Sequence, residues 1–168
     1  MQRGAKRLKN WYDSKVFLMS AVSLSVVILD FITKKIIETH VQPGEIINLL
    51  PFLRIVNVKN KGAAFGLFSG LSNNTFIFIS VVAIIAIILY MLKTSKRLEL
   101  LSLSLILGGA VGNLTDRIQI GQVIDFIDFF VYNWHWPAFN VADSALSIGI
   151  ILFILSGIIH GKKGEDNS

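Results

Sequence analysis

The 168-residue sequence has no cysteine and few charges. The lack of cysteine excludes disulfide bridges, a thiol nucleophile and thiolate metal ligands. Charged residues make up 16% of the chain and hydrophobic residues 53%, with a mean hydropathy of +0.63. A soluble domain of this length rarely carries so much apolar surface, so we expect a single-domain integral membrane protein. We expect no nucleic-acid partner, because the usual Lys and Arg excess in cytoplasmic loops accounts for the net charge of +5.

Two other signals are missing. The three histidines share no ligand spacing and there is no His-Glu-x-x-His motif, so we expect no metal and no other cofactor. The basic start and the apolar stretch from Val16 resemble a secretory signal peptide, but no small-residue cleavage site follows Leu29. We therefore expect this stretch to be an uncleaved membrane span.

Four hydrophobic segments approach the length of about 20 residues that a helical span requires. They cover residues 16–37, 75–92, 98–115 and 141–159. In lipid only helices and closed barrels satisfy the backbone, and these runs are too long and too little alternating for barrel strands. The predicted fold class is an all-α integral membrane protein, a four-transmembrane-helix bundle. The predicted outer loops are 38–74 and 118–140, and residues 161–168 are predicted to be a disordered tail.

The outer loop 38–74 contains a β-prone stretch. Residues Pro51–Lys59 are rich in β-forming side chains, and a turn-like Asn60-Lys61-Gly62 follows. We therefore expect a small extracytoplasmic β-sheet on the membrane surface. The loop 118–140 mixes acidic and aromatic residues, which suggests a loop half-sunk in the interface.

The distribution of Lys and Arg predicts the orientation. With the N-terminus inside, the inner segments hold ten cations and four acids, and the outer segments hold six cations and seven acids. This asymmetry favours both termini in the cytoplasm. The inner cations are Arg3, Lys6, Arg7, Lys9, Lys15, Lys93, Lys96, Arg97, Lys162 and Lys163.

This topology gathers the unusual polar groups at one outer depth. They are Asp30, Asn60, Asn113, Asp116, Arg117, Asp125, Asp128, Asn140 and Asp143. Asp143 is the most demanding of them, because it opens an apolar run where a charge is costly. Two aspartates brought together tend to share one proton, and such a pair can activate water while polarising a carbonyl. The residues alone leave five candidates for the pair: Asp30, Asp116, Asp125, Asp128 and Asp143.

These groups also have structural interpretations. Asp116, Arg117 and Asn113 can form an ion-pair and hydrogen-bond cluster. Asp30 and Lys34 have the i,i+4 spacing of a helical salt bridge. Asp128 can be a solvated loop acid, and Asp143 can cap a helix. The Gly108–Gly112 spacing favours close helix packing. No outer serine stands out above Ser144 as a partner for Lys34 in a Ser/Lys protease.

Five motifs in this order resemble the lipoprotein signal peptidases, the type II signal peptidases of bacteria. They lie at Asp30–Lys34, Asn60–Gly66, Gly108–Arg117, Val123–Asp128 and Phe139–Ser144. Each block alone is weak, but together in a four-span chain they are specific. One position departs from the family pattern, because Phe31 stands where a glutamine is usual.

The resemblance implies an aspartic endopeptidase that removes signal peptides from prolipoproteins carrying a diacylglyceryl-cysteine. It implies that Asp125 and Asp143 form the catalytic pair. The supporting polar residues would be Asp30, Lys34, Asn60, Asn113, Arg117 and Asn140. It also implies binding of the cyclic peptide globomycin. We expect a monomer in the bacterial cytoplasmic membrane, surrounded by lipid, with its active site at the outer leaflet surface. The alternative is a small non-enzymatic four-helix transporter or lipid-binding protein.

Overall fold

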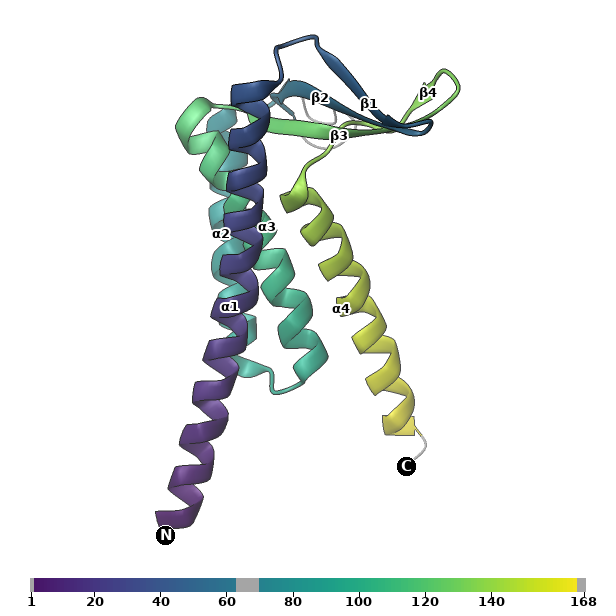
Figure 1. The fold of residues 1–168 in the computed structure, drawn as a ribbon. Coiled ribbons are helices and arrows are strands. Elements are labelled where there is room, and N and C mark those ends of the chain that lie inside the picture. The colour runs from purple at the N-terminus through teal and green to yellow at the C-terminus, as the bar shows by residue number, and fades with distance from the viewer. Residues whose placement is uncertain (1, 63–69, 166–168) are drawn as a thin grey trace.

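Four helices stand beneath a small sheet that lies across one end of the bundle (Figure 1). The computed structural model describes residues 2–62 and 70–165. The helices are α1 (Gln2–His40), α2 (Asn73–Lys93), α3 (Arg97–Ile120) and α4 (Val141–Glu165). The strands are β1 (Ile46–Leu50), β2 (Leu53–Asn60), β3 (Val123–Val131) and β4 (Trp134–His135). Both chain ends lie at the end of the bundle opposite the sheet (Figure 1).

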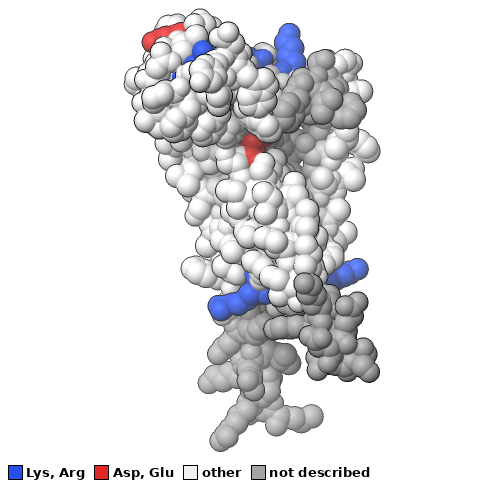
Figure 2. Space-filling view, turned by 90° about the vertical axis from the view of Figure 1, so that its right-hand side faces the viewer, with Lys and Arg blue, Asp and Glu red and all other residues white. Residues whose placement is uncertain are grey.

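All four helices are long and apolar enough to cross a membrane. The candidate spans are Ser14–His40, Asn73–Lys93, Arg97–Ile120 and Val141–Ile159. Figure 2 shows a face on which lysines and arginines lie towards the two ends, while the band between them is uncharged except for one acidic spot just below the sheet. The predicted fold class, a four-helix membrane bundle with a small sheet, is confirmed.

The helices extend beyond the predicted limits. The structure continues α1 back to Gln2 and α3 forward to Ile120, where Gly121 ends the helix in the left-handed conformation. It also places residues 161–165 in α4, although the sequence predicted a disordered tail there. Extending an existing helix fixes one residue per hydrogen bond gained and avoids the cost of a new nucleus. Residues 166–168 of the predicted tail lie outside the described residues.

Glycines on α3 let two neighbouring helices approach its backbone. A Cβ on Gly108 would lie 2.7 Å from Cβ of Val26 on α1, and one on Gly112 would lie 2.7 Å from Oδ2 of Asp30. A Cβ on Gly109 would collide with the carbonyl oxygen of Ala142 on α4. The close-packing interpretation of Gly108 and Gly112 is therefore confirmed, and α3 holds α1 and α4 at the depth where the polar residues gather.

The sheet is antiparallel in the order β1-β2-β3-β4. The prediction of β structure at 51–59 is confirmed by β2. The interpretation of 118–140 as a half-sunk loop was wrong for Val123–Val131, which form a nine-residue strand. This strand pairs with β2, and its inward residues Ile124 and Phe126 pack with Ile37 and Val41 at the end of α1. That burial depends on residues distant in sequence, which a local pattern does not reveal.

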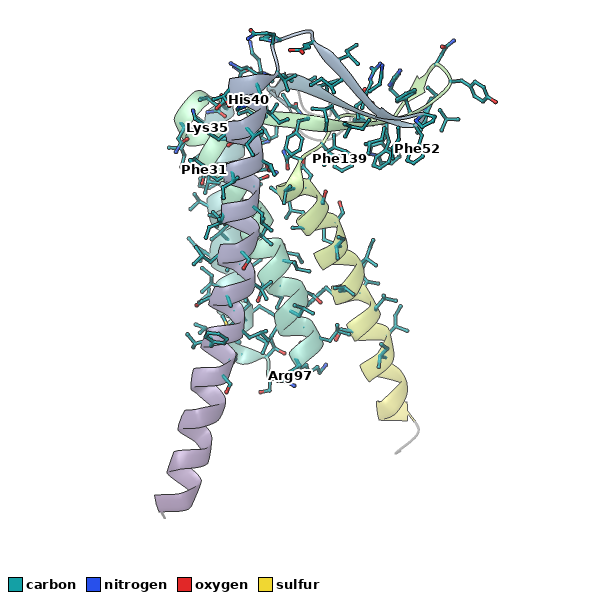
Figure 3. The ribbon with its side chains drawn as sticks, in the orientation of Figure 1. Phe31, Lys35, His40, Phe52, Arg97 and Phe139 are labelled. Carbon is teal, nitrogen blue, oxygen red and sulfur yellow. The ribbon has the colours of Figure 1, made fainter. Side chains whose placement is uncertain are left out.

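An aromatic series lies along the face of the sheet towards α4. The rings of Phe52 and Phe129 stack with centroids 6.2 Å apart, and those of Phe129 and Phe139 with centroids 5.9 Å apart. Phe52 and Phe139 are labelled beneath the sheet in Figure 3. The backbone of Phe139 also pairs with Ile127 of β3, donating and accepting at 3.0 and 2.8 Å. The start of α4 is thereby fixed beside β3.

Candidate active site

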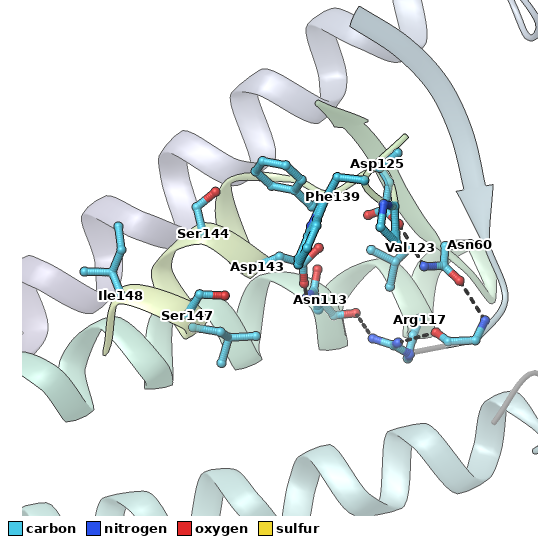
Figure 4. A pocket seen from close by; sticks show the side chains of 15 residues that line it. Asn60, Asn113, Arg117, Val123, Asp125, Phe139, Asp143, Ser144, Ser147 and Ile148 are labelled. Atoms are coloured by element: carbon cyan, nitrogen blue, oxygen red, sulfur yellow. Dashed lines mark hydrogen bonds between the residues drawn. The ribbon is translucent and has the colours of Figure 1, made fainter. Parts of the chain in front are cut away.

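A hollow of about 490 Å³ opens between the sheet and the adjacent ends of α3 and α4. Its apolar lining is interrupted by a few convergent polar groups, which is the usual composition of a ligand site. The polar side chains come from β2, β3, α3 and α4 (Figure 4). Those predicted from the sequence are Asn60, Asn113, Arg117, Asp125 and Asp143.

Asp125 extends from β3 into this hollow and is 2% exposed. Within the described residues, each of its carboxylate oxygens accepts a hydrogen bond from an asparagine. Nδ2 of Asn60 donates to Oδ2 at 2.8 Å, and Nδ2 of Asn140 donates to Oδ1 at 2.7 Å. Asn60 reaches Asp125 because β2 and β3 pair with Val58 opposite Asp125. Sheet register therefore places the first carboxylate.

The pKa of Asp125 is raised from 3.8 to about 7, mainly because burial penalises the charged carboxylate. The hydrogen bond from Asn60 works in the opposite direction, and the nearby negative charge of Asp143 raises the pKa further. A carboxyl group that titrates near neutrality can serve either as an acid or as a base at the pH of a living cell.

Asp143 lies in the first turn of α4 and lines the same hollow. Its Oδ1 accepts a hydrogen bond of 2.7 Å from Nδ2 of Asn113 on α3. Its backbone N–H donates to Oδ1 of Asn140 at 2.8 Å. Asn140 precedes the helix and bonds the third helical N–H, so the capping residue is Asn140 and the cap interpretation of Asp143 was wrong. Asp143 is the third residue of the helix, and its side chain lines the hollow.

Asn113 and Asn140 join the two carboxylates into one network. Nδ2 of Asn140 donates to Oδ1 of Asn113 at 3.3 Å as well as to Asp125. Asn113 uses its own Nδ2 for Asp143. A continuous chain of amide hydrogen bonds thus runs from the strand carboxylate to the helix carboxylate, and it fixes the orientation of both amides.

Lys34 supports this network from α1. It is 3% exposed, and its Nζ lies 2.7 Å from Asp30 and 2.8 Å from Asp116. It also donates to Oδ1 of Asn113 at 3.2 Å. A buried ammonium with two carboxylates and an amide oxygen around it is fully hydrogen-bonded, as a buried charge must be. Because Oδ1 of Asn113 accepts from the ammonium, the Nδ2 group of Asn113 is oriented towards Asp143.

Asp30 and Asp116 hold the frame of the site rather than line the hollow. Oδ1 of Asp30 accepts the backbone N–H of Ala142 at 2.8 Å, so a side chain of α1 anchors the first turn of α4. Oδ2 of Asp116 accepts the backbone N–H of Ile124 at 3.1 Å, next to Asp125. The two acids therefore connect Lys34 to the backbones beside the two site carboxylates.

Arg117 closes the α3 side of the hollow. It donates to the carbonyl oxygen of Gly62 at 3.1 Å and lies over the ring of Phe76, 5.0 Å from its centroid. A guanidinium is a strong donor to carbonyl and carboxylate oxygens, and its planar group also stacks on aromatic rings. Arg117 thus links the end of β2 to α2 while remaining on the wall of the hollow.

Several known proteins with similar sequences are lipoprotein signal peptidases. A sequence model described as signal peptidase (SPase) II matches residues 22–159. A lipoprotein signal peptidase from Thermodesulfovibrio yellowstonii is 42% identical over 144 residues, which cover 86% of this chain and 97% of that protein. One from Serratia marcescens is 42% identical over 142 residues, 83% of each chain. This chain belongs to the signal peptidase II family.

Solved structures agree with that membership. A bacterial membrane enzyme determined by the in meso method at 2.3 Å resolution is 35% identical, with a TM-score of 0.81 over 86% of this chain and 90% of that one. A second, at 1.9 Å, is 36% identical, with a TM-score of 0.74 over 82% and 90%. As a signal peptidase II family member, the chain is a protease and a multi-pass protein of the bacterial inner membrane. The resemblance seen in its motifs is confirmed, and the transporter alternative is not favoured.

Of the five candidate aspartates in this signal peptidase II chain, the structure brings Asp125 and Asp143 to the hollow. Asp128 points away from it and bonds Arg54 of β2 and His135 of β4. That contact replaces the interpretation of Asp128 as a solvated loop acid. Asn140, Lys34 and Asp30 contact the network as described, and Arg117 lies on the wall. The 63–66 part of the second motif lies outside the described residues.

Sequence reasoning missed part of the apolar wall. Trp136, Pro137 and Ala138 line the hollow from the segment before α4, and Ser147 and Ile148 line it from α4. The signal was present in the helical period, because Ser147 follows Asp143 by four positions and Ile148 follows Ser144 by four, and residues four apart share a helix face. Nothing in the local sequence shows that the 136–138 segment folds over that face.

Proposed function

We propose that this chain removes the signal peptides of diacylglyceryl-modified prolipoproteins, cutting before the lipidated cysteine with water activated by Asp125 and Asp143. The observation that carries the proposal is one hollow shared by two carboxylates, one from β3 and one from α4. The family supplies the class of reaction, and its relatives named lipoprotein signal peptidases supply the class of substrate.

The mechanism is that of an aspartic protease. One proton is shared by the pair, because two carboxylates at one site do not both ionise readily. The ionised carboxylate accepts a proton from a water molecule as the water oxygen adds to the scissile carbonyl carbon. The protonated carboxyl group donates its proton to the carbonyl oxygen. As the carbon–nitrogen bond breaks, one hydroxyl of the tetrahedral intermediate returns its proton to the ionised carboxylate, and the other carboxyl group gives its proton to the leaving amine, so the pair again holds one proton.

The supporting residues have separable roles in this proposal. Asn60 and Asn140 hold the two oxygens of Asp125, and Asn113 holds Asp143. Lys34 and Asp30 hold the frame. Arg117 is left on the wall, where it can donate to a substrate carbonyl. No acyl-enzyme forms, because water itself attacks.

The site suits a substrate that stays in the membrane. The distribution of Lys and Arg supports cytoplasmic termini, which puts the sheet and the hollow at the outer leaflet. The hollow has an apolar lining beside the α4 face, where acyl chains and the end of a signal helix can remain in lipid while the scissile bond reaches the carboxylates. We expect a monomer to suffice, because both carboxylates come from one chain, and we expect globomycin to occupy this hollow.

The decisive experiment is cleavage of a purified prolipoprotein in detergent micelles. The substrate is supplied with and without the diacylglyceryl group on its cysteine, and the product's new N-terminus is identified by mass spectrometry. We expect cleavage before the cysteine of the lipidated form only, insensitivity to serine-directed reagents, and competition by globomycin. Equal cleavage of the unmodified precursor would overturn the substrate assignment while leaving the peptidase assignment intact.

A further inference from the structure

A second groove lies between α1 and α3 and shares no lining residue with the catalytic hollow. It has a volume of about 260 Å³ and a mostly apolar surface. Val27, Ile28 and Phe31 line it from α1, and Thr115 lines it from α3. Phe31, which is 55% exposed, is an apolar side chain available to whatever fills this groove.

Towards the sheet the groove continues into a shallow hollow whose lining includes charged side chains. The two share Phe31 and Asp116. The shallow hollow adds the polar side chains of Lys34, Lys35, Glu38 and Gln119, together with Ile120 and Ile124. Figure 3 shows Phe31 and Lys35 on the same side of α1, with Lys35 nearer to the sheet. A mostly apolar lining is therefore followed by one that carries exposed charges, in the direction from the bundle's middle to its end.

Lys35 and Glu38 form a loose ion pair at the polar end. Nζ of Lys35 lies 3.8 Å from Oε2 of Glu38, and their side chains are 63% and 30% exposed. A solvent-exposed pair at this separation contributes little to stability, so each charge is free to exchange its partner for a ligand of opposite sign. The pair offers a cation and an anion side by side.

We propose that this groove binds one zwitterionic phospholipid with a primary ammonium headgroup. An acyl chain occupies the apolar part, the phosphate binds Lys35 and the ammonium binds Glu38. The groove opens on a membrane-spanning surface, where lipid is the surrounding solvent. An anionic lipid without an ammonium leaves Glu38 facing a net negative charge. Among zwitterionic lipids, only a primary ammonium has N–H groups to donate to the Glu38 carboxylate.

The occupied groove has a consequence for the buried ion network. Asp30 and Asp116 line its floor, and their carboxylates hold Lys34. An acyl chain over this floor keeps water away, and the ion pairs are less screened in a dry environment. The lipid thus covers the Asp30 and Asp116 carboxylates of the Lys34 network.

Photocrosslinking tests the proposal directly. The chain is reconstituted in phosphatidylcholine nanodiscs with a trace of phosphatidylethanolamine carrying a diazirine in its acyl chain, and adducts are mapped by peptide mass spectrometry. We expect adducts at Val27, Ile28 and Phe31 to exceed several-fold those at Ile85, which is similarly exposed on α2. Equal labelling of α2 would mean ordinary boundary lipid and would overturn the proposal.

Matched variants and probes separate the headgroup from the groove. Lys35→Ala with Glu38→Ala should remove the enrichment, and Val27→Phe should remove it by filling the groove. Lys59→Ala, at an exposed lysine of β2, should leave it unchanged. Phosphatidylglycerol or phosphatidylcholine probes should show no enrichment, and equal enrichment with either contradicts the assigned headgroup. Because crosslinking needs no catalysis, lipid binding stands or fails apart from the peptidase activity.

Discussion

The amide nitrogen of Asn140 lies 2.7 Å from Oδ1 of Asp125. The amide oxygen of the same residue accepts the backbone N–H of Asp143 at 2.8 Å. One fully buried side chain therefore positions a strand carboxylate and starts the helix that carries the other. Asn140 thus uses its amide oxygen to cap α4 and its amide nitrogen to hold Asp125. A substitution that keeps only one of these groups can separate the two roles.

Asn140→Ala should lose both functions, whereas Asn140→Ser should lose only one. Loss of the cap in the alanine variant is expected to lower the free energy of unfolding by roughly 0.5–2 kcal/mol. Serine also caps helices, so the serine variant should retain most of that stability. The shorter serine side chain does not reach Asp125 with a donor, so cleavage should remain low in both variants. Thermal unfolding and single-turnover cleavage measure the two effects. Recovery of activity in the serine variant would show that Asn140 acts only as a cap.

Asp125→Asn and Asp143→Asn should each reduce kcat by ~10³-fold or more, because neither amide can exchange a proton with water or the leaving amine. Both variants should still insert and fold. The matched control is Asp128→Asn on the same strand, whose side chain bonds Arg54 and His135 away from the hollow. It should keep activity within a few-fold. Full activity of Asp125→Asn or of Asp143→Asn in a purified cleavage assay would refute the catalytic assignment.

Stability should depend on pH through Asp125. Its pKa is raised in the folded protein, from 3.8 to about 7, so the folded state binds the proton more tightly than the unfolded state. The stabilising contribution is complete below pH 4 and is lost as the pH rises to about 7. Relative to the parent chain, the apparent Tm of Asp125→Asn should therefore improve between pH 5 and pH 8. A constant difference would mean that Asp125 is ionised throughout.

The same proton predicts the alkaline limb of activity. The shared-proton pair loses its last proton when the pH exceeds about 7, so kcat should fall tenfold per pH unit well above that value. The measurement is a kcat profile from pH 5 to 9 with lipidated substrate. A flat profile through pH 9 is incompatible with an acid role for the pair.

Two neighbouring lysines provide a matched pair for stability. Lys34→Met removes a buried cation and leaves Asp30 and Asp116 as uncompensated carboxylates, which is expected to cost about 3–5 kcal/mol. Lys35→Met, at the next position, removes an exposed cation with a loose partner and should change stability by less than ~0.5 kcal/mol. Thermal unfolding of both variants checks this. Similar losses for the two would argue that the Lys34 network is not what holds the frame.

Gly109→Ala should separate α3 from α4. The added Cβ meets the carbonyl oxygen of Ala142 and lies 2.8 Å from Cγ of Leu146. A backbone carbonyl cannot move aside as the end of a flexible side chain can. Overpacking of this kind lowers the free energy of unfolding by roughly 1–3 kcal/mol. Gly157→Ala on α4 is the control, because nothing lies within 4 Å of its added Cβ. Cleavage should fall with the first variant and remain with the second.

The sequence alone determined the four spans, because about 20 consecutive apolar residues have one stable arrangement in lipid. It also determined that its polar groups gather at one depth, and its motif order named Asp125 and Asp143. What it left open was which contacts hold them. The sequence predicts a loop where Val123–Val131 form a strand. The contacts that stabilise this strand, its burial against α1 and its pairing with β2, are with residues distant in sequence.

Only the tertiary structure decided the roles of the remaining acids. Asp30, Asp116 and Asp128 look alike in sequence, yet one anchors α4 at Ala142, one fixes Ile124 of β3, and one pairs with Arg54 across the sheet. A carboxylate's role depends on the donors around it, and these donors come from elements up to 112 positions away. Local sequence fixes which groups can ionise and where a helix can cross a membrane. Packing alone determines which of those groups lie on a common hollow.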